Sequence, residues 1–179
     1  MSLILLEKPR YSMTHAELVC IGANWLRGAM KCHATLTELD SCSGEIPDII
    51  GWKFNYRSIL IECKTSKSDF YADKSKPFRV KVEDGMGYWR YYLTPKGLLK
   101  PKDVEGTGWG ILETSGKQVR ILVRSKPFFK RNGRAEMSLL TKALRRVQFR
   151  INQPLHEVVA WSSCGTVVEI DYGTQTSIN

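Results

Sequence analysis

The sequence contains no hydrophobic run that approaches the ~20 apolar residues of a membrane-spanning helix, and the apolar stretch at residues 3–6 is too short for the core of a signal peptide. Its five cysteines are odd in number and scattered without paired spacing. That pattern argues against a disulfide framework and against a structural zinc site. We therefore expect a protein without a membrane partner in a reducing, intracellular (cytoplasmic) location.

The signatures of several enzyme classes are also missing. No glycine-rich phosphate loop is present, so a built-in nucleotide-driven motor is not expected. The three histidines, His15, His33 and His156, are isolated from one another, and we expect them to be structural. No Ser/His/Asp or Cys/His arrangement indicates nucleophilic catalysis. The chain also has no internal repeats and no low-complexity segments.

What the sequence has is an excess of positive charge. Lys and Arg number 27 against 18 Asp and Glu, which gives a formal net charge of +9. A basic excess of this size favours a polyanion as partner. The excess is concentrated in three groups, which are Lys74 with Lys76, Arg79 and Lys81; the seven cations between Lys117 and Arg134; and Lys142 with Arg145, Arg146 and Arg150.

At 179 residues the chain is long enough for one well-formed core and too short for two comfortable domains. We expect a single domain over 1–179, with its core at about 14–124 and a C-terminal helix and tail at 134–179. The predicted elements are a helix at 14–30, strands at 32–39, 46–54 and 58–64, a helix at 66–76, a loop at 77–88, a strand at 90–94, a hairpin of 109–114 and 118–124, an amphipathic helix at 134–150 and a strand at 166–170. This order predicts an α/β fold on a mixed central sheet.

The most informative stretch is Pro47-Asp48 followed by an apolar strand that ends in Glu62-Cys63-Lys64. Successive strand side chains alternate between the two faces of a sheet, so Glu62 and Lys64 should point the same way. A turn near residues 55–56 can fold the preceding segment back and bring Asp48 beside Glu62. Two acids and a lysine at one edge of a sheet suit a divalent cation and a water next to it.

This arrangement resembles the PD-(D/E)XK nuclease superfamily, which includes restriction endonucleases, phage exonucleases, junction resolvases and repair nucleases. Pro47-Asp48 is similar to the PD half of the signature and Glu62-Cys63-Lys64 to the E-x-K half. The resemblance covers roughly residues 14–95 and implies a restriction-endonuclease-like α-β-β-β-α-β core, here with a C-terminal hairpin and amphipathic helix added. The phrase at 62–70 is also similar to small phage- and prophage-encoded members, so a viral origin is compatible with the resemblance.

The resemblance implies a metal-dependent nuclease that hydrolyses phosphodiester bonds of DNA through Asp48, Glu62 and Lys64, joined by Glu17 from the first helix. The implied cofactor is Mg²⁺ or Mn²⁺, which prefers oxygen ligands such as the carboxylates of Asp48, Glu62 and Glu17 and the backbone carbonyl of Cys63. The cation would act as a Lewis acid and would activate a bound water. Lys64 would orient that water and stabilise charge on the phosphate.

These acids also have simpler structural explanations. Glu62 and Lys64 could form a surface pair on an edge strand, which contributes little stability. Glu17 lies three residues after Thr14, where a capping box favours Glu for local reasons. Glu45, close to the PD signature, is a candidate substitute ligand, although a loop residue is the more ordinary interpretation.

Six cations are candidates for contacts with nucleic-acid phosphates, with solvated surface residues as the alternative: Lys67, Lys74, Arg79, Arg90, Lys130 and Arg131. Tyr88 or Trp89, in an aromatic run, could stack on bases of a single strand, whereas aromatics on a strand more often belong to the core. The turn at 128–134 combines aromatics with charge and suits nucleic-acid binding or a dimer contact equally well.

DNA is the predicted partner, with RNA as an alternative, and a homodimer would suit paired cuts on a duplex. A second functional hypothesis is a nucleic-acid-binding module with a nuclease-like fold that is inactive alone or needs a partner. A third is a basic structural protein whose signature is a chance match. Intact Asp48, Glu62 and Lys64 argue against a degenerate site.

Overall fold

The computed structural model describes residues 13–151, and its strands form one six-stranded sheet in the order β1-β2-β3-β4-β5-β6. The strands are β1 (Ala34–Thr37), β2 (Ile49–Trp52), β3 (Ser58–Cys63), β4 (Trp89–Pro95), β5 (Gly110–Thr114) and β6 (Val119–Val123). The first three pair antiparallel, β4 is parallel to both β3 and β5, and β6 is antiparallel to β5. The expectation of an α/β protein on a mixed sheet is confirmed.

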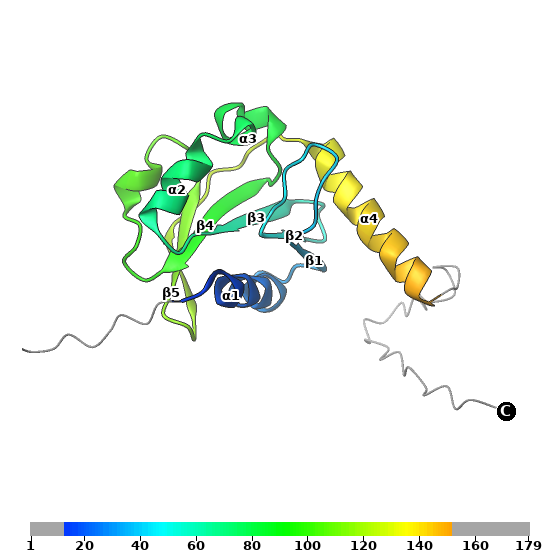
Figure 1. Cartoon of the computed structure of the whole chain (residues 1–179), viewed down its shortest axis with the longest axis horizontal. Helices are drawn as coiled ribbons and strands as arrows, with labels where there is room; N and C mark the ends of the chain where they lie inside the picture. Colours follow the sequence, from blue (N-terminus) through cyan, green and yellow to red (C-terminus); the bar gives the residue numbers. More distant parts are fainter. Residues whose placement is uncertain (1–12, 152–179) are drawn as a thin grey trace, which may run out of the picture. The chain divides into compact units, whose positions relative to one another are not determined.

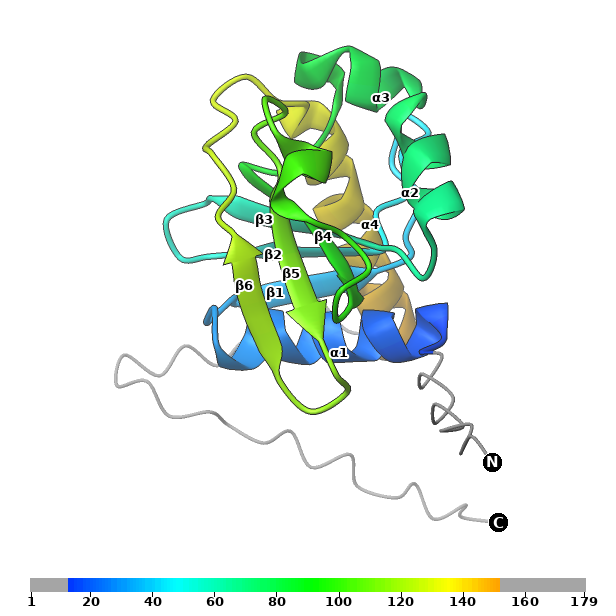
Figure 2. The ribbon, with the colours of Figure 1, turned by 90° about the vertical axis from the view of Figure 1, so that its left-hand side faces the viewer.

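Helices lie on both sides of this sheet. Figures 1 and 2 show α1 (His15–Gly28) on one side, with α2 (Lys67–Lys74) and the short α3 (Pro77–Val80) on the other. Two 3₁₀ turns, η1 (Val82–Asp84) and η2 (Pro101–Val104), flank β4, and α4 (Gly133–Ile151) follows the last strand. The elements therefore run helix, three strands, helix, strand, in the predicted order, because α2 and α3 form the crossover that the parallel β3–β4 pair requires.

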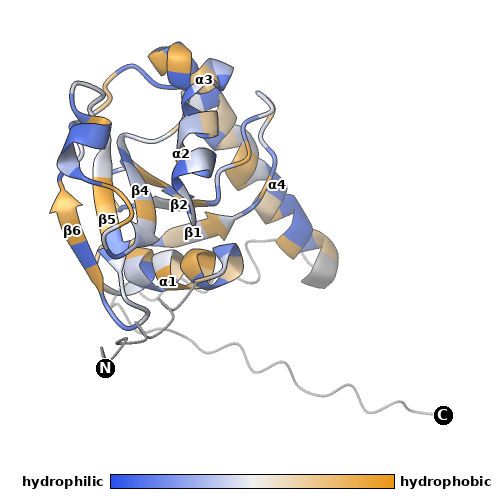
Figure 3. Ribbon diagram, turned by 60° about the vertical axis from the view of Figure 1, so that its left-hand side comes forward, coloured by the Kyte–Doolittle hydropathy of each residue, from blue (hydrophilic) through white to orange (hydrophobic). Residues whose placement is uncertain are grey.

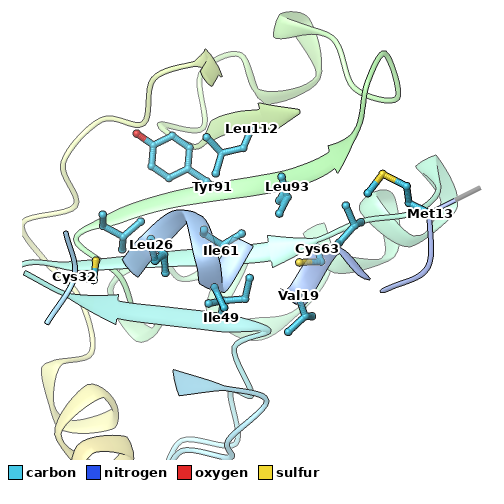
Figure 4. Close-up of a cluster of buried hydrophobic side chains, with 13 residues drawn as sticks. Met13, Val19, Leu26, Cys32, Ile49, Ile61, Cys63, Tyr91, Leu93 and Leu112 are labelled. Carbon is cyan, nitrogen blue, oxygen red and sulfur yellow. The ribbon is translucent and has the colours of Figure 1, made fainter. Parts of the chain in front are cut away.

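The face of the sheet that α1 covers is apolar. Figure 4 shows residues of α1 pointing at side chains from β2, β3, β4 and β5. Gly22 lets the helix approach closely, since a Cβ there would collide with Ile49 and Leu93. This core consists mainly of Leu18, Val19, Ala23 and Leu26 from α1, packed on Ile49, Ile59, Ile61, Cys63, Tyr91, Leu93 and Leu112.

The segment after α2 differs from the expectation. A loop was predicted for 77–88, whereas the structure forms α3 and η1 there and then buries the backbone of 85–88. The reason is Arg90, whose guanidinium donates hydrogen bonds to the carbonyls of Val82 (3.0 Å), Gly85 (2.9 Å) and Gly87 (3.1 Å). One buried side chain thus replaces regular backbone pairing as the constraint on this segment.

The chain divides into two compact units, residues 1–141 and 142–179, with the boundary inside α4. The predicted strand at 166–170 and most of the tail lie outside the described residues, so the expectation of a single domain stays a prediction. Over residues 13–151, no helix combines the length and the apolar character needed to cross a membrane.

Candidate functional site

The face of the sheet opposite α1 carries polar and charged side chains. Alternation along β3 turns Glu62 toward α2 and α3, and Lys64 follows it on the same side, with Lys64 Nζ 3.7 Å from Glu62 Oε2. On β4 the same face presents Arg90 and Tyr92, both buried. Figure 3 shows β4 as largely polar in colour beside the more hydrophobic β5. We call this surface the ionic face.

Asp48 reaches the ionic face from the start of β2. Ile49 pairs with Ile61 across the antiparallel ladder, so Asp48 lies opposite Glu62 where β2 begins and β3 ends. Its Oδ2 accepts the backbone N–H of Cys63 at 2.6 Å. The structure therefore brings Asp48, Glu62 and Lys64 together at the C-terminal end of β3.

The centre of the ionic face is Arg79, whose side chain is only 4% exposed. Its guanidinium contacts three carboxylates at once: Glu45 Oε1 at 2.6 Å, Glu62 Oε1 at 3.0 Å and Asp73 Oδ2 at 2.9 Å. The contacts with Glu45 and Asp73 are hydrogen bonds, while the approach to Glu62 is an ion pair without hydrogen-bond alignment. These acids keep the pKa of Arg79 well above its usual value despite burial, so the guanidinium is a fixed positive charge.

Lys64 lies at the edge of the same group. Its Nζ is 3.3 Å from Asp73 Oδ1 and 3.7 Å from Asp69 Oδ1, in addition to its contact with Glu62. Burial lowers the pKa of Lys64, but the neighbouring carboxylates, Glu62 first, outweigh it and raise the pKa above its usual value. Lys64 is therefore a cation near neutral pH, which suits charge stabilisation and not service as a base.

Acidic side chains outnumber basic ones in this network. The ion pairs join four carboxylates, Glu45, Glu62, Asp69 and Asp73, to three cations, Lys64, Lys76 and Arg79. Asp48, next to this network, is a fifth acid. Burial raises the pKa of Glu62 to about 8; Arg79 opposes that shift, and Asp48 and Asp73 add to it. For Asp73 burial is outweighed, chiefly by Arg79, and its pKa falls to about 2.

The first turn of α1 touches the site through His15. Its Nε2 is 3.5 Å from Asp48 Oδ1 and 3.6 Å from Glu38 Oε1. We expected His15 to be structural and did not anticipate this contact with Asp48, because the pairing of β1 with β2 and the packing of α1 bring these residues together. Glu17 instead forms the predicted capping box, accepting hydrogen bonds from Thr14 N (2.8 Å) and Thr14 Oγ1 (3.0 Å).

The donor chemistry of the site fits a hard divalent cation only in part. Asp48 and Glu62 supply carboxylate oxygens, and Mg²⁺ keeps several of its waters, so a few protein oxygens suffice. Within residues 13–151, however, no three His, Cys, Asp or Glu side chains are already grouped so that they could hold a metal ion. Glu62 faces Arg79 and Lys64, and a cation would have to compete with them for its carboxylate.

Of the six residues predicted to contact phosphates, two are buried and four are exposed or partly exposed. Arg90 is 1% exposed and Arg79 is nearly as buried, so both guanidinium groups are engaged inside the protein and we leave them out of any binding surface. Lys67 and Lys74 are exposed on α2, where both also contact Asp103 of η2. Lys130 is exposed, and Arg131 is partly exposed while its Nε lies 3.1 Å from Glu136.

Sequence reasoning missed Asp73 and undervalued Glu45. Asp73 is 1% exposed and lies one helical turn after buried Phe70, so the inward face of α2 was the signal that could have identified it. Glu45 is fully buried in a loop, and its Oε2 accepts the N–H of Met86 at 2.9 Å. No local pattern marks Glu45, because its partners lie far along the chain.

No protein-family model matches the sequence, and no curated protein matches it. Among solved structures, the fold is similar to that of the SPO1766 protein of unknown function from Silicibacter pomeroyi, with a TM-score of 0.59 and 20% sequence identity. The similarity covers 78% of this chain and 92% of that chain. At this identity the comparison establishes a shared fold and nothing about activity.

Proposed function

We propose that this chain is a metal-dependent nuclease of the PD-(D/E)XK type that hydrolyses phosphodiester bonds of DNA. The observation that carries the proposal is the placement of Asp48 opposite Glu62, with Lys64 on the same face, where β2 begins and β3 ends. The surrounding order of elements, with β4 parallel to β3, is the one that the resemblance to this superfamily implies. A restriction-endonuclease-like core is part of the proposal.

Each residue has a distinct task in this proposal. Asp48 and Glu62, with the carbonyl of Cys63, would hold Mg²⁺ or Mn²⁺, which when bound supplies Lewis acidity and activates water. Asp48 is fixed for this task by the N–H of Cys63. Lys64, kept charged by its neighbours, stabilises negative charge on the phosphate. Glu17 is a weaker candidate, because its carboxylate already serves the cap of α1.

The acids around Glu62 support a cation at this position. Asp48 and Asp73 add to the burial that raises the pKa of Glu62, and a bound divalent ion would stabilise these carboxylates in their ionised form. The overall net charge of +9 supports a polyanionic substrate outside this acidic group. A homodimer, an intracellular location and a viral origin stay predictions.

One observation favours the alternative, a nucleic-acid-binding module that is inactive alone or needs a partner. Arg79 Nη2 lies 3.0 Å from Glu62 Oε1 and neutralises part of the charge that a metal would use. In that case the ionic face would only support the fold, and binding would depend on the basic surface.

The decisive experiment is cleavage of a panel of single-stranded, duplex, branched and flapped DNA, and of RNA, with Mg²⁺, Mn²⁺ or EDTA. We expect metal-dependent cutting by the wild type and its loss in Asp48→Asn, which keeps an oxygen acceptor for the N–H of Cys63. Glu38→Gln is the matched control, since Glu38 contacts the same His15 but lies outside the signature. Binding without cutting of any substrate would favour the module, and equal cutting by Asp48→Asn would contradict the proposed site.

A further inference from the structure

The tip of the β2–β3 hairpin presents two aromatic rings to solvent. Lys53 N–H donates to the carbonyl of Arg57 at 3.0 Å and closes a three-residue loop, 54–56. The side chains of Phe54 and Tyr56 are 81% and 86% exposed. The Phe54 ring contacts the ring of His33, with centroids 5.6 Å apart, yet both tip residues leave most of their surface open to a ligand.

Tyr56 also has a backbone conformation that is unfavourable for a residue with a β-carbon. Its φ of 60° lies in the left-handed region, and the last residue of such a three-residue loop is usually glycine. A β-carbon there costs free energy, and a ring that is 86% exposed recovers little of it by packing. Gly at this position would stabilise the loop more than Tyr does. The presence of Tyr56 therefore indicates a requirement other than stability, such as ligand binding.

The tip continues into a basic and aromatic surface. Arg57 lies over the ring of Tyr88 at 4.8 Å, and Tyr88 meets the ring of Phe129 at 5.6 Å. Phe129 is 76% exposed, and Arg131 lies 5.5 Å from the Tyr88 ring. Tyr88 is itself buried beneath these groups, so we define the tip patch by its exposed and partly exposed members, which are Lys53, Phe54, Tyr56, Arg57, Phe129, Lys130 and Arg131.

We infer that the tip patch binds unpaired nucleotides of a nucleic-acid strand. Exposed rings give bases a surface on which to stack, and stacking tolerates any base sequence because every base has a π-face. Lys53, Arg57 and Lys130 complement the phosphates, and Arg131 adds a cation whose Nε pairs with Glu136 at 3.1 Å. This inference rests on the proposed function and narrows its substrate to nucleic acid with a single-stranded part.

The tip patch is separate from the candidate nuclease site. The patch adjoins the start of β3 at Ser58, whereas Glu62 lies near the end of that strand. At ~3.3 Å per residue the four-residue step along the strand is about 13 Å. Substitutions at the tip therefore leave the carboxylates intact.

The test is fluorescence anisotropy with a fluorescein-labelled 12-nucleotide oligothymidylate and a labelled 12-base-pair duplex, in EDTA. We expect tighter binding of the single strand, with Phe54→Ala and Tyr56→Gly each weakening it roughly tenfold. Tyr71→Ala is the matched control, because Tyr71 is 53% exposed on α2, outside the patch, and its loss should leave both affinities unchanged. Tyr56→Gly should also melt at a temperature no lower than the wild type, which separates lost binding from lost folding.

Unchanged single-strand affinity in both tip variants would overturn this inference while leaving the proposed nuclease intact. Absence of binding to either oligonucleotide by the wild type would overturn the inference too, whereas metal-dependent cutting in the panel would still sustain the proposed function. Binding to vesicles of anionic lipid that the tip variants abolish, with oligonucleotide affinity unaltered, would assign the patch to a membrane surface and overturn the inference.

Discussion

Ile61 and Glu62 are neighbours on β3, yet they face different kinds of environment. Ile61 points to α1 and is fully buried among aliphatic side chains. Glu62 points to α2 and α3 and is also almost fully buried, but among Arg79, Lys64 and further acids. One face of the sheet is thus aliphatic, whereas the other surrounds an ionic network with apolar side chains such as Leu60 and Phe70, and both faces are shielded from water.

The two faces of the sheet contribute differently to the free energy of folding. Burial of aliphatic surface is favourable at roughly 25 cal/mol per Å² and needs no exact partner. Burial of charges costs desolvation, and a well-packed apolar replacement of an ion pair is often equally stable or more stable. Burial of apolar surface therefore favours the fold directly, whereas the ionic network is costly to bury and costly to disrupt once it has formed.

Arg79→Met should have the largest effect on stability. It would leave Glu45, Glu62 and Asp73 buried without their shared cation, and removing one partner of a buried pair costs about 3–5 kcal/mol. Urea unfolding measures the change. Lys81→Met, which removes an exposed cation 3.2 Å from Asp84, is the matched control and should cost less than about 1 kcal/mol. Equal effects of the two substitutions would show that the ionic face is not a coupled network.

The free energy of unfolding should depend on pH through Glu62. Burial raises its pKa to about 8, above the usual 4.5, so the folded protein binds this proton more tightly than the unfolded chain. Its contribution is fully present below about pH 4.5 and is lost as the pH rises through about 8. Denaturant unfolding in EDTA between pH 5 and 9 measures this, and Glu62→Gln should flatten the decline. A wild-type stability that rises over this interval would contradict the electrostatic description.

Ile61→Val should cost about 0.5–1.5 kcal/mol, because it removes one methyl group from the close-packed aliphatic face. Since no titrating group is involved, the loss should be the same at pH 5 and pH 9. Thermal unfolding at both values measures it. A loss that varies with pH would mean that the two faces are coupled through β3.

Glu17→Gln should have the smallest effect. Gln also serves at this position of a capping box, so we expect a change in stability below about 0.5 kcal/mol and nuclease activity like that of the wild type. Melting and cleavage assays on the same preparation measure both. If Glu17→Gln abolished cleavage without changing the melting temperature, Glu17 would instead be a ligand of the proposed metal ion.

Much of the fold was predictable, because its signals are local. The capping box at Thr14 and the helical stripe behind it located α1, and alternation located β3 with Glu62 and Lys64 on one face. Five of the six strands are shorter than predicted, as in β1, which covers Ala34–Thr37 where 32–39 was expected, whereas β4 covers Trp89–Pro95 where 90–94 was expected. Apolar patterning locates an element, but backbone pairing sets its ends.

The ionic network was not predictable in the same way. Glu45, Asp73 and Arg79 meet only after the loop, the crossover helix and α3 have folded over the sheet. A buried Arg and a surface Arg are identical in sequence, which is why Arg79 and Arg90 were both assigned to phosphate contacts. The left-handed conformation of Tyr56 is likewise invisible in the sequence, since residues 55–56 indicated only a turn.

The most direct test of the central claim, that the end of β3 on the ionic face is a divalent cation site, is calorimetric titration of the protein with Mn²⁺. We predict saturable binding by the wild type, a loss of at least tenfold in affinity for Asp48→Asn, and binding like that of the wild type for Glu38→Gln. Equal affinity in all three proteins, or no binding by the wild type, would contradict the claim and leave the ionic face as a structural feature of the fold.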